Sequence, residues 1–587
     1  MNNMESDILF LQIDHLSNFQ YTAFNIGMLS IATLLKKNGF IVKCLKNMEL
    51  SCLNYSEKKE YLKKLNPKVI GFNINSDNIY NVKYIARDIK KWLPNTIILL
   101  GGPLVGIIKD SILNETSFDM AIVGEGEFST LKLCEKIIKN KGNYENIEGL
   151  IYRDKKGKIF MNSIAEPIEV LDILPPIDYS LTNKTRGFSY SSGRGCPYNC
   201  SFCFRGVHGK GYRYVSSKRV INDIISTCEK YNSTFVGIMD DTFVANPQRT
   251  KEICEGLKIE KANRNLDFAL FCEARIDTLY RHPELIPILK NAGFMKIQLG
   301  IENGNQEILD AYNKRITIEQ IESVVKNLAK QKYICANANI IMGGAFETEK
   351  TFDKSLNFAI KLMNLAPGYL EFSPALLCPF PGTDICNNPS KYGLKLIDTK
   401  WLKSITLTRP SCTTDSLNVQ RIAELNISFL EKIDLEMNKI IARLKFDDIN
   451  FRISLAKYGI HSLFYFRILE IAPIIQKYFA LKNNYSRFRL EEVSIKQIMN
   501  SRPLRLKEPS YIKNRYFLSD YLKPVYIDTP VEKAIYDLSN GKLTMIEIAE
   551  YVKYKTDCLF GMNEIIDKIM LPFYKRLETS YHILFQL

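Results

Sequence analysis

Three cysteines lie close together in the segment CPYNCSFCF (196–204). Cys196, Cys200 and Cys203 follow the spacing C-x3-C-x2-C. Thiolates bind soft metals, and three of them on one loop can hold three irons of a [4Fe–4S] cluster, leaving the fourth iron open. The alternative is a zinc site completed by His208, although zinc ligands normally come from two separate knuckles. The spacing therefore favours an iron–sulfur cluster over zinc.

The remaining cysteines of the fourteen show no such spacing. In a reducing cytosol, scattered cysteines are mostly small buried apolar side chains rather than disulfide partners. We therefore expect core positions for the cysteines at 44, 52, 134, 228, 254, 272, 335, 378, 386, 412 and 558.

The composition is that of an ordinary globular protein. With 587 residues, 46% of them apolar and 24% charged, the chain can form about three or four domains with cores of their own. It contains no run of about eighteen apolar residues, which predicts that no helix spans a membrane. The acidic start MNNMESDILFLQIDH lacks the basic region of a signal peptide, so we expect a cytoplasmic protein.

The net charge is +15, from 79 basic and 64 acidic residues. Such a charge can indicate a polyanionic partner. However, the lysines are dispersed, and no compact basic stripe with interleaved aromatic residues occurs. We therefore expect a solvated lysine-rich surface, and we do not expect nucleic acid as a partner.

Strand-like and helix-like segments alternate through residues 1–165. A helix is expected at 27–39, ended by Gly39, and another at 82–93. Such alternation predicts a Rossmann-like α/β domain, with a parallel sheet covered by helices on both faces. Its ligands should bind beyond the carboxyl ends of the strands, where the segments NINSDN, GGP and GEGE fall. The expected strands are 7–14, 69–74, 96–102 and 120–127.

A proline-containing linker, 166–187, precedes a second region of alternating strands and helices at 188–400. Six strand–helix units predict a partial (β/α)6 barrel, whose chemistry should lie at the carboxyl ends of its strands. The expected strands are 188–195, 234–241, 266–275, 295–302, 334–342 and 370–377. Several polar side chains converge on those ends and favour a site there, namely Asp240, Asp241, Glu273, Arg275 and Glu302.

The rest of the chain is expected to be mainly helical over 401–505, followed by a small domain at 506–587. Within that domain, residues 524–554 predict a short strand, a helix, a turn and a second helix, as in a winged helix. Thr544 is the expected N-cap of the second helix, with Glu547 at its third position.

The cysteine segment matches the C-x3-C-x-aromatic-C motif of the radical S-adenosylmethionine (SAM) superfamily. Several downstream segments resemble successive elements of that superfamily's barrel, namely MDDTFVAN, FCEARID, LGIENGNQEILDAYNKRIT, ANIIMGGAFET and PFPGT. In one large branch of the superfamily, a cobalamin-binding domain is fused before the barrel. Four upstream segments resemble that domain, namely NIGMLSIATLLKKNGF, GGP, FDMAIVGEGE and EGLIYRD. Over residues 7–400, the chain therefore resembles the cobalamin-dependent radical SAM enzymes.

This resemblance implies three cofactors: a [4Fe–4S] cluster, SAM and cobalamin. In that family, electron transfer from the cluster cleaves SAM to a 5′-deoxyadenosyl radical, and methylcobalamin commonly donates a methyl group to the resulting substrate radical. The resemblance assigns the cluster to Cys196, Cys200 and Cys203, and places Phe202 beside the adenine. It suggests further SAM contacts at Arg213, Glu273, Arg275 and Glu302. It suggests a cobalamin pocket lined by Ser76, Gly101, Gly102, Pro103, Gly124 and Glu125.

Two departures from the family pattern concern local geometry. The segment GGAFET (343–348) stands where the family often has GxPGET, which leaves the turn there open. The D-x-H-x-x-G signature of cobalamin mutases is absent, because Asp14 and His15 are adjacent. We therefore expect His15 to be a loop residue rather than a cobalt ligand.

The leading hypothesis is a methyltransferase that acts on an unactivated carbon of a peptide or natural product. A peptide is favoured because residues 524–554 resemble the small leader-recognition domain of ribosomal peptide-modifying enzymes; a small metabolite or a lipid intermediate is the other choice. An electron donor such as flavodoxin or ferredoxin would be a partner. No residue is singled out as catalytic beyond the cofactor contacts.

Three other hypotheses remain. The first keeps both cofactors but ends in cyclisation or ring rearrangement without methyl transfer. The second is a transfer-RNA methylthiotransferase, which needs three further cluster cysteines, whereas Cys44, Cys52 and Cys134 have the wrong spacing. The third is a cobalamin- or zinc-binding regulator with a DNA-binding winged helix, which would not need the polar groups at the barrel rim.

Overall fold

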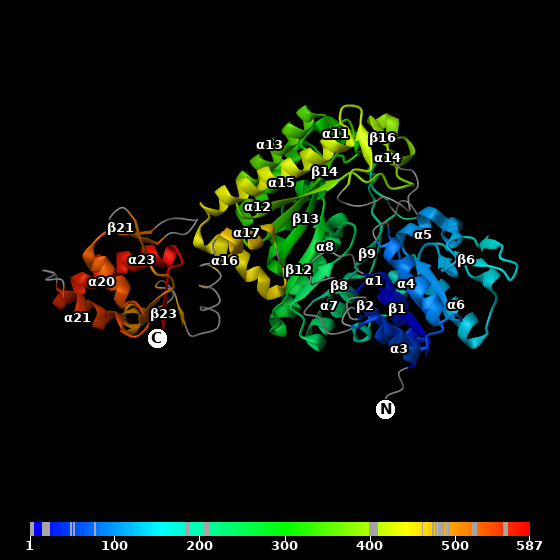
Figure 1. Cartoon of the computed structure of the whole chain (residues 1–587), viewed down its shortest axis with the longest axis horizontal. Coiled ribbons are helices and arrows are strands. Elements are labelled where there is room, and N and C mark those ends of the chain that lie inside the picture. The colour runs from blue at the N-terminus through cyan, green and yellow to red at the C-terminus, as the bar shows by residue number, and fades with distance from the viewer. Residues whose placement is uncertain are drawn as a thin grey trace. The chain divides into compact units, whose positions relative to one another are not determined.

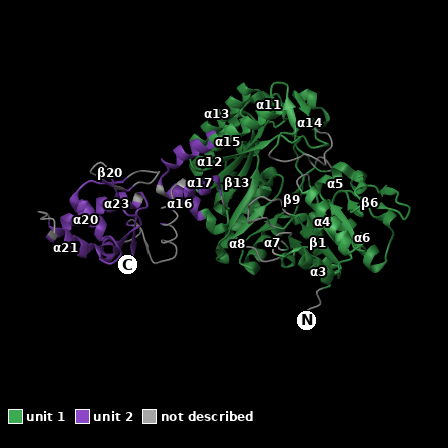
Figure 2. Ribbon diagram, viewed as in Figure 1, with its two compact units in different colours: residues 1–431, 455–460 green, residues 432–454, 461–587 purple. Residues whose placement is uncertain are grey.

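Figure 1 shows the computed structural model of the chain. The structure describes residues 5–13, 24–46, 50, 53–75, 78–182, 187–204, 206, 211–397, 409–460, 462–471, 475, 478, 487–488, 490, 494–512, 515–518, 525–555 and 561–586. The chain divides into two compact units (Figure 2). Unit 1 comprises Met1–Glu431 and Leu455–Ile460, and unit 2 comprises Lys432–Ser454 and His461–Leu587.

Unit 1 begins with a seven-stranded sheet in the order β2-β1-β3-β4-β5-β6-β7. Strands β1 to β5 pair in parallel, whereas β6 and β7 are antiparallel additions at the edge. The strands are β1 (Ile8–Gln12), β2 (Val42–Lys46), β3 (Val69–Asn73), β4 (Ile97–Gly101), β5 (Met120–Ile122), β6 (Leu150–Arg153) and β7 (Ile159–Met161). Its helices are α1 (Ile26–Lys37), α3 (Tyr55–Leu65), α4 (Ile79–Trp92), α5 (Pro103–Ile108) and α6 (Glu127–Lys139).

Both faces of this sheet are buried, as the apolar alternation along β1 shows. Leu9 and Leu11 pack into a core shared with α3 and α4, whereas Ile8 and Phe10 pack into a second core shared with α1 and α6. Successive side chains of a strand point to opposite faces, so two separate cores require helices on both sides. The predicted Rossmann-like architecture is confirmed.

A second sheet of unit 1 has six parallel strands in the order β15-β14-β13-β12-β11-β8. Each strand pairs with the next one along the chain, as in an open barrel, and helices follow the strands (Figure 1). The predicted six-unit partial barrel is confirmed. Its strands are β8 (Gly187–Tyr190), β11 (Phe235–Ile238), β12 (Ala269–Ala274), β13 (Phe294–Glu302), β14 (Cys335–Met342) and β15 (Leu370–Leu376). Its helices include α7 (Ser217–Tyr231), α8 (Pro247–Asn263), α9 (Ile276–Arg281), α10 (Leu285–Ala292), α11 (Gln306–Ala311), α12 (Ile318–Gln331) and α13 (Glu349–Leu365).

Unit 1 also contains two short antiparallel strand pairs, and a long helix begins in unit 1 and ends within the residues of unit 2. The antiparallel pair of β9 (Gly193–Arg194) and β10 (Arg213–Tyr214) flanks the cysteine segment. A second antiparallel pair joins β16 (Leu394–Leu396) to β17 (Cys412–Thr414). The helix α15 (Val419–Ile441) follows. Among the described residues of both units, no helix is both long enough and apolar enough to cross a membrane.

Unit 2 combines helices with two three-stranded antiparallel sheets. The predicted strand–helix–turn–helix segment is present as β22, α20 and α21. Thr544 and Glu547 cap α21 reciprocally, because the Thr544 amide donates to the Glu547 carboxylate at 2.7 Å and the Glu547 amide donates to Thr544 Oγ1 at 3.3 Å. The sheets are β18 (Arg487–Phe488)-β23 (Ile583–Gln586)-β19 (Arg502–Arg505) and β20 (Ser510–Ile512)-β21 (Arg515–Leu518)-β22 (Val525–Ile527). The helices include α16 (Phe446–Ser454), α17 (Leu463–Ile471), α19 (Ile495–Asn500), α20 (Pro530–Leu538), α21 (Met545–Lys555) and α23 (Leu571–Thr579).

A buried histidine makes the stability of unit 2 depend on pH. His582 is fully buried beside β23, and neither ring nitrogen has a hydrogen-bond partner among the described residues. Burial lowers the pKa of His582 from 6.5 to about 4, and Lys507 adds to the shift. Because the folded pKa lies below the unfolded one, the stability is full above pH 6.5 and is lost as the pH falls toward 4.

We expect the free energy of opening of unit 2 to fall by about 2 kcal/mol between pH 7.5 and pH 5, and His582→Phe to remove most of this dependence. Hydrogen exchange of the full chain, read on peptides covering β19 and β23 and corrected for the intrinsic rate, measures this energy. His282→Gln is the control, because the His282 side chain is 40% exposed. An equal loss in wild type and His582→Phe would contradict the prediction.

Candidate cofactor sites

The cysteine segment leaves β9 and is held by the residues that follow α11. The Ser201 amide donates to the Tyr312 carbonyl at 2.9 Å, and the Asn313 side chain donates to the Asn199 carbonyl at 2.7 Å. The Phe202 ring packs edge-on against Tyr312, with ring centroids 5.1 Å apart. These contacts fix the backbone between Cys196 and Cys203.

The three cysteine sulfurs lie close enough to influence one another. Desolvation of the sulfur, together with the neighbouring Cys200, Asp241 and Cys196, raises the pKa of Cys203 to about 12. No group of three or more His, Cys, Asp or Glu side chains in the described part of the chain is arranged around a single metal ion. A four-iron cluster does not require such convergence, because each cysteine binds a different iron. His208, the expected fourth ligand of the zinc alternative, lies outside the described residues.

Arg275 fastens the end of β12 to the cysteine loop. Its guanidinium lies 3.7 Å from the Cys200 sulfur, and it stacks 3.5 Å from the centre of the Tyr198 ring. The same group donates to Asp277 at 2.9 Å and to the Lys314 carbonyl at 2.7 Å. Arg275 is buried, and these contacts occupy it, so the structure brings this predicted residue to the cysteines themselves.

Acidic side chains from three neighbouring strands gather beside the cysteines. Burial, together with the charges of Asp241 and Glu302, raises the pKa of Glu273 to about 7. Glu302 ends β13 with a φ of +67° and pairs with Lys314, whose Nζ lies 2.6 Å from its carboxylate. Lys314 also lies 5.9 Å from the Phe202 ring. The predicted Glu273, Glu302 and Phe202 are therefore brought together, and Lys314 is a member that sequence reasoning missed.

Asp240, unlike the acidic residues beside the cysteines, binds the backbone before the cysteine segment. Burial raises the pKa of Asp240 to about 6. Its carboxylate accepts hydrogen bonds from the Ser192 amide at 2.6 Å and from the Gly193 amide at 2.9 Å. These bonds fix the chain between β8 and β9, and so they orient the start of the cysteine segment.

The turn GGAFET follows β14, and the glutamate within it, Glu347, accepts a hydrogen bond from the backbone of the same turn. Glu347 is buried and accepts a hydrogen bond from the Gly343 amide. Burial raises the pKa of Glu347 to about 7. Phe346 adopts a positive φ of +53° in this turn, and Thr348 then caps α13 through Thr351. The geometry that the missing GxPGET motif left open is thus a tight turn organised by Glu347.

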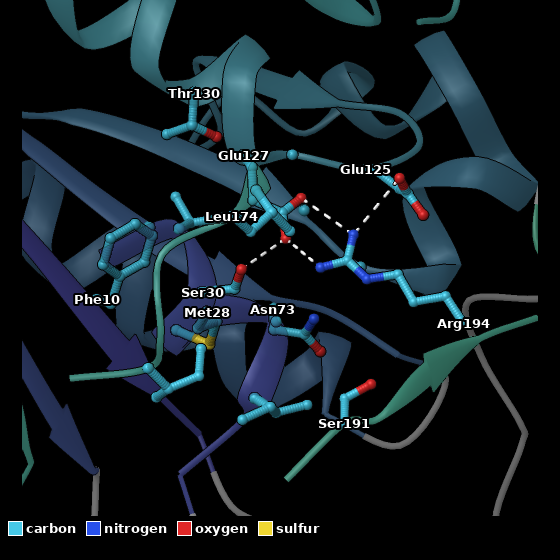
Figure 3. A pocket seen from close by; sticks show the side chains of 18 of the residues that line it. Phe10, Met28, Ser30, Asn73, Glu125, Glu127, Thr130, Leu174, Ser191 and Arg194 are labelled. Carbon is cyan, nitrogen blue, oxygen red and sulfur yellow. Dashed lines mark hydrogen bonds and ion pairs between the residues drawn. The ribbon is translucent and has the colours of Figure 1, made fainter. Parts of the chain in front are cut away.

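A cavity of about 300 Å³ opens at the carboxyl ends of the seven-stranded sheet (Figure 3). It is lined by four of the predicted cobalamin contacts, namely Gly101, Gly102, Gly124 and Glu125. Pro103 begins α5 directly after Gly102, and Ser76 lies outside the described residues, as do Asp14 and His15. Other lining residues come from the strands and helices of this sheet, from the linker and from the segment around β9; they include Phe10, Met28, Ser30, Asn73, Glu127, Leu174, Ser191 and Arg194.

Glycine is required where the chain passes closest to this cavity. Gly102 has a φ of +103°, and a Cβ there would lie 2.7 Å from the Ile74 carbonyl oxygen. Gly124 also has a positive φ, of +92°. A bare backbone leaves room for a bulky ligand to approach closely at this edge of the sheet.

A chain of charges crosses from the cavity to the barrel (Figure 3). Glu127 accepts hydrogen bonds from Ser30 at 2.7 Å and from Arg194 at 2.5 Å, and Arg194 also lies 3.4 Å from Glu125. Arg213 donates to Glu125 at 2.6 Å. Two residues predicted for different cofactors, Arg213 for SAM and Glu125 for cobalamin, therefore pair with each other.

The seven-stranded sheet with its glycine-lined cavity, and the partial barrel with its three-cysteine loop, define a class of protein. The family model described as B12 binding domain matches residues 15–132. The model described as Radical SAM superfamily matches residues 190–359. The chain is a cobalamin-dependent radical SAM enzyme, and its cofactors are a [4Fe–4S] cluster, SAM and cobalamin.

Two named relatives match the chain at low identity. An uncharacterized methyltransferase of Pyrococcus horikoshii is 28% identical over 365 residues, which cover 60% of this chain and 76% of that protein. The anaerobic magnesium-protoporphyrin IX monomethyl ester cyclase of Rubrivivax gelatinosus is 26% identical over 341 residues, which cover 56% of this chain and 60% of that protein. The chain thus spans about three fifths of the length of the cyclase.

Two solved structures share the fold. The radical SAM methyltransferase TsrM of Kitasatospora setae, with cobalamin and a [4Fe–4S] cluster bound, superposes with a TM-score of 0.57 at 15% identity, covering 73% of this chain and 89% of that one. The cobalamin-dependent radical SAM enzyme OxsB, with aqua-cobalamin and SAM bound, gives a TM-score of 0.59 at 18% identity, covering 81% of this chain and 71% of that one.

Proposed function

We propose that the enzyme transfers a methyl group to an unactivated carbon of a peptide or natural-product substrate. When bound, its cofactors supply a 5′-deoxyadenosyl radical that removes a substrate hydrogen and a methyl group that replaces it. One observation carries the proposal most directly: the glycine-lined cavity and the cysteine loop share strand β9. Arg194 of β9 lines the cavity, and Cys196 follows only two residues later.

In this proposal, Cys196, Cys200 and Cys203 each bind one iron. Arg275 keeps Cys200 in place, because its guanidinium lies 3.7 Å from the sulfur. The three thiolates leave the fourth iron for SAM.

The acidic group beside the cysteines would bind the polar end of SAM. Glu273 and Glu302 would accept hydrogen bonds from its ammonium group, and Phe202 would lie against its adenine. Lys314, held by Glu302 at 2.6 Å, is placed to pair with the SAM carboxylate. Because the pKa of Glu273 is raised to about 7, a bound cation would also shift this carboxyl group toward its charged form.

Unit 2 supports a peptide substrate. Its segment β22–α20–α21 has the strand–helix–turn–helix order of a small recognition domain. We propose that it binds a part of the substrate that is not modified. A flavodoxin or ferredoxin of the cytoplasm would deliver the electron that the cluster needs.

A second candidate function is cyclisation or ring rearrangement without methyl transfer. It is favoured by the Rubrivivax gelatinosus relative, a cyclase that matches the chain at 26% identity. Both candidates use the same cofactors, and they differ only in the fate of the substrate radical.

Mass spectrometry separates the two candidates. The anaerobically loaded enzyme, a reductant and SAM carrying a trideuteromethyl group are incubated with peptide and metabolite extracts of the cells that encode the chain. We expect products heavier by one trideuteromethyl group in place of one hydrogen, formed only when cobalamin is present. Products lacking hydrogen atoms but carrying no label would favour cyclisation, and labelled products formed without cobalamin would contradict the proposal.

A further inference from the structure

The strands β13, β14 and β15 present polar side chains on one face of the barrel sheet. Gln298 pairs directly with Asn337 of the next strand, and Asn339 pairs with Ser373 of the strand after that. Directly paired residues point to the same face, so these four side chains form one surface. We call Gln298, Asn337, Asn339 and Ser373 the amide surface.

The opposite face of the same strands is closed and apolar. Ile297 and Leu299 of β13, and Ala336 and Ala338 of β14, are fully buried. All four members of the amide surface are partly exposed. The helices cover the buried apolar face of these strands. The polar, partly exposed face is therefore the inner face of the barrel.

The amide surface leads to the cysteine loop. Glu273 of β12 pairs with Gln298 and therefore lies on the same face. Lys314 lies 2.6 Å from Glu302 at the end of β13 and 5.9 Å from the ring of Phe202 in the cysteine loop, which places this end of the sheet beside the loop. A molecule resting on the amide surface therefore lies beside the position that we propose for SAM.

Much of the hydrogen-bonding capacity of this surface is unused. Gln298 and Asn339 make no side-chain hydrogen bond to another residue that the structure describes. Ser373 donates to the Asn337 side-chain oxygen at 2.9 Å, which leaves the amide hydrogens of Asn337 for a ligand. Covering these groups with hydrocarbon would leave them unpaired, at a cost that apolar contact does not offset.

The charges on these strands are already compensated. Lys296 lies 2.8 Å from Glu371, and both side chains are largely buried. Glu302 is paired with Lys314. A charged substrate group would therefore meet no free counter-ion on β13, β14 or β15, whereas a neutral polar group would find donors and acceptors.

We propose that the amide surface selects the substrate, and that the bound group is neutral and rich in amides or hydroxyls rather than a hydrocarbon. This rests on the proposed function, which places the reacting carbon in the barrel. Asparagine and glutamine offer a donor and an acceptor side by side, so they pair well with a peptide bond or with adjacent hydroxyl groups.

The test is binding, measured by saturation-transfer NMR on the enzyme loaded with cluster, cobalamin and SAM. The probes are N-acetylglycine methylamide for peptide groups, methyl β-glucoside for hydroxyl groups, and cyclohexane for hydrocarbon. We expect the first or the second probe to bind. The probe that binds more tightly shows whether the polar group of the substrate is a peptide bond or a set of hydroxyl groups. We expect the double variant Gln298→Leu and Asn339→Leu to weaken this binding about ten-fold.

The control variant is Gln248→Leu, which changes an exposed glutamine on the outer helix α8. Iron and cobalamin contents equal to wild type show that each variant is folded, and Asn339→Ala removes one amide without adding bulk. Equal or stronger binding of cyclohexane, unchanged binding in the double variant, or binding of neither polar probe would overturn the inference. If the polar probes bind as expected but no methyl group is ever transferred, the proposed function fails and the amide surface stands.

Discussion

Cys200→Ala is expected to leave the enzyme without its cluster and without activity. Cys200 is the most buried of the three cysteines, and it is the one that Arg275 contacts. Its loss leaves two thiolates and a buried guanidinium without its sulfur partner, so the fourth iron can no longer be presented to SAM. Because radical formation needs that iron, we expect a loss of at least about 10³-fold in 5′-deoxyadenosine formation.

Three measurements on anaerobically loaded protein check this result: iron content, sulfide content and 5′-deoxyadenosine formed with a strong reductant. Cobalamin content should remain at the wild-type level, because the cavity of the N-terminal sheet does not include Cys200. Cys254→Ala is the matched control, since it removes a fully buried thiol from α8. It should lower stability by about 1 kcal/mol and leave iron unchanged. Wild-type iron content in Cys200→Ala would refute the assignment.

Local patterns in the sequence predicted β1, β3, β4 and β5 of the first sheet and all six strands of the second, but they missed β2, β6 and β7. The apolar runs of β1, β3 and β4 are short and bounded by turn residues, so they could be placed from periodicity alone. Gly39 ends α1 with a φ of +84°, as its position after the last helical turn predicted. In unit 2, the short strands β18, β20 and β21 escaped notice, because two to four residues are too few to show alternation.

The contacts within the sites could be predicted only in part. The cysteines and the glycines after the strands belong to contiguous segments, which a sequence displays directly. Arg194 and Glu127 are 67 residues apart, and nothing in their local segments shows that they meet. Lys314 lies in a loop where a lysine is normally solvated, and only the folded chain places it against Glu302.

The second large effect is expected from Arg194→Gln, which removes the cation between the cavity and the barrel. Glu127 has a side-chain exposure of 4%, and its other partner is the neutral Ser30. Without Arg194, Glu127 keeps a buried charge that no cation compensates directly. Breaking a buried pair in this way costs about 3–5 kcal/mol, whereas an exposed pair contributes at most about 1 kcal/mol.

We expect this cost to appear as weaker cobalamin binding, because both residues line the cavity. A loss of about 2 kcal/mol in binding free energy corresponds to about a 30-fold higher dissociation constant. Equilibrium dialysis with hydroxocobalamin measures it. Iron content should stay near the wild-type value, since Arg194 precedes the cysteines and does not belong to the proposed cluster ligands.

Two further variants show whether the charge itself is responsible. Lys36→Gln breaks an exposed pair, in which Lys36 lies 2.7 Å from Asp178 and its side chain is 48% exposed, so it should leave cobalamin binding unchanged. The double variant Arg194→Gln with Glu127→Gln removes both charges and should recover part of the lost affinity, because no unpaired carboxylate remains. If the double variant binds cobalamin more weakly than Arg194→Gln, the two residues contact the cofactor independently, and the charge pair is not what holds the cavity in shape.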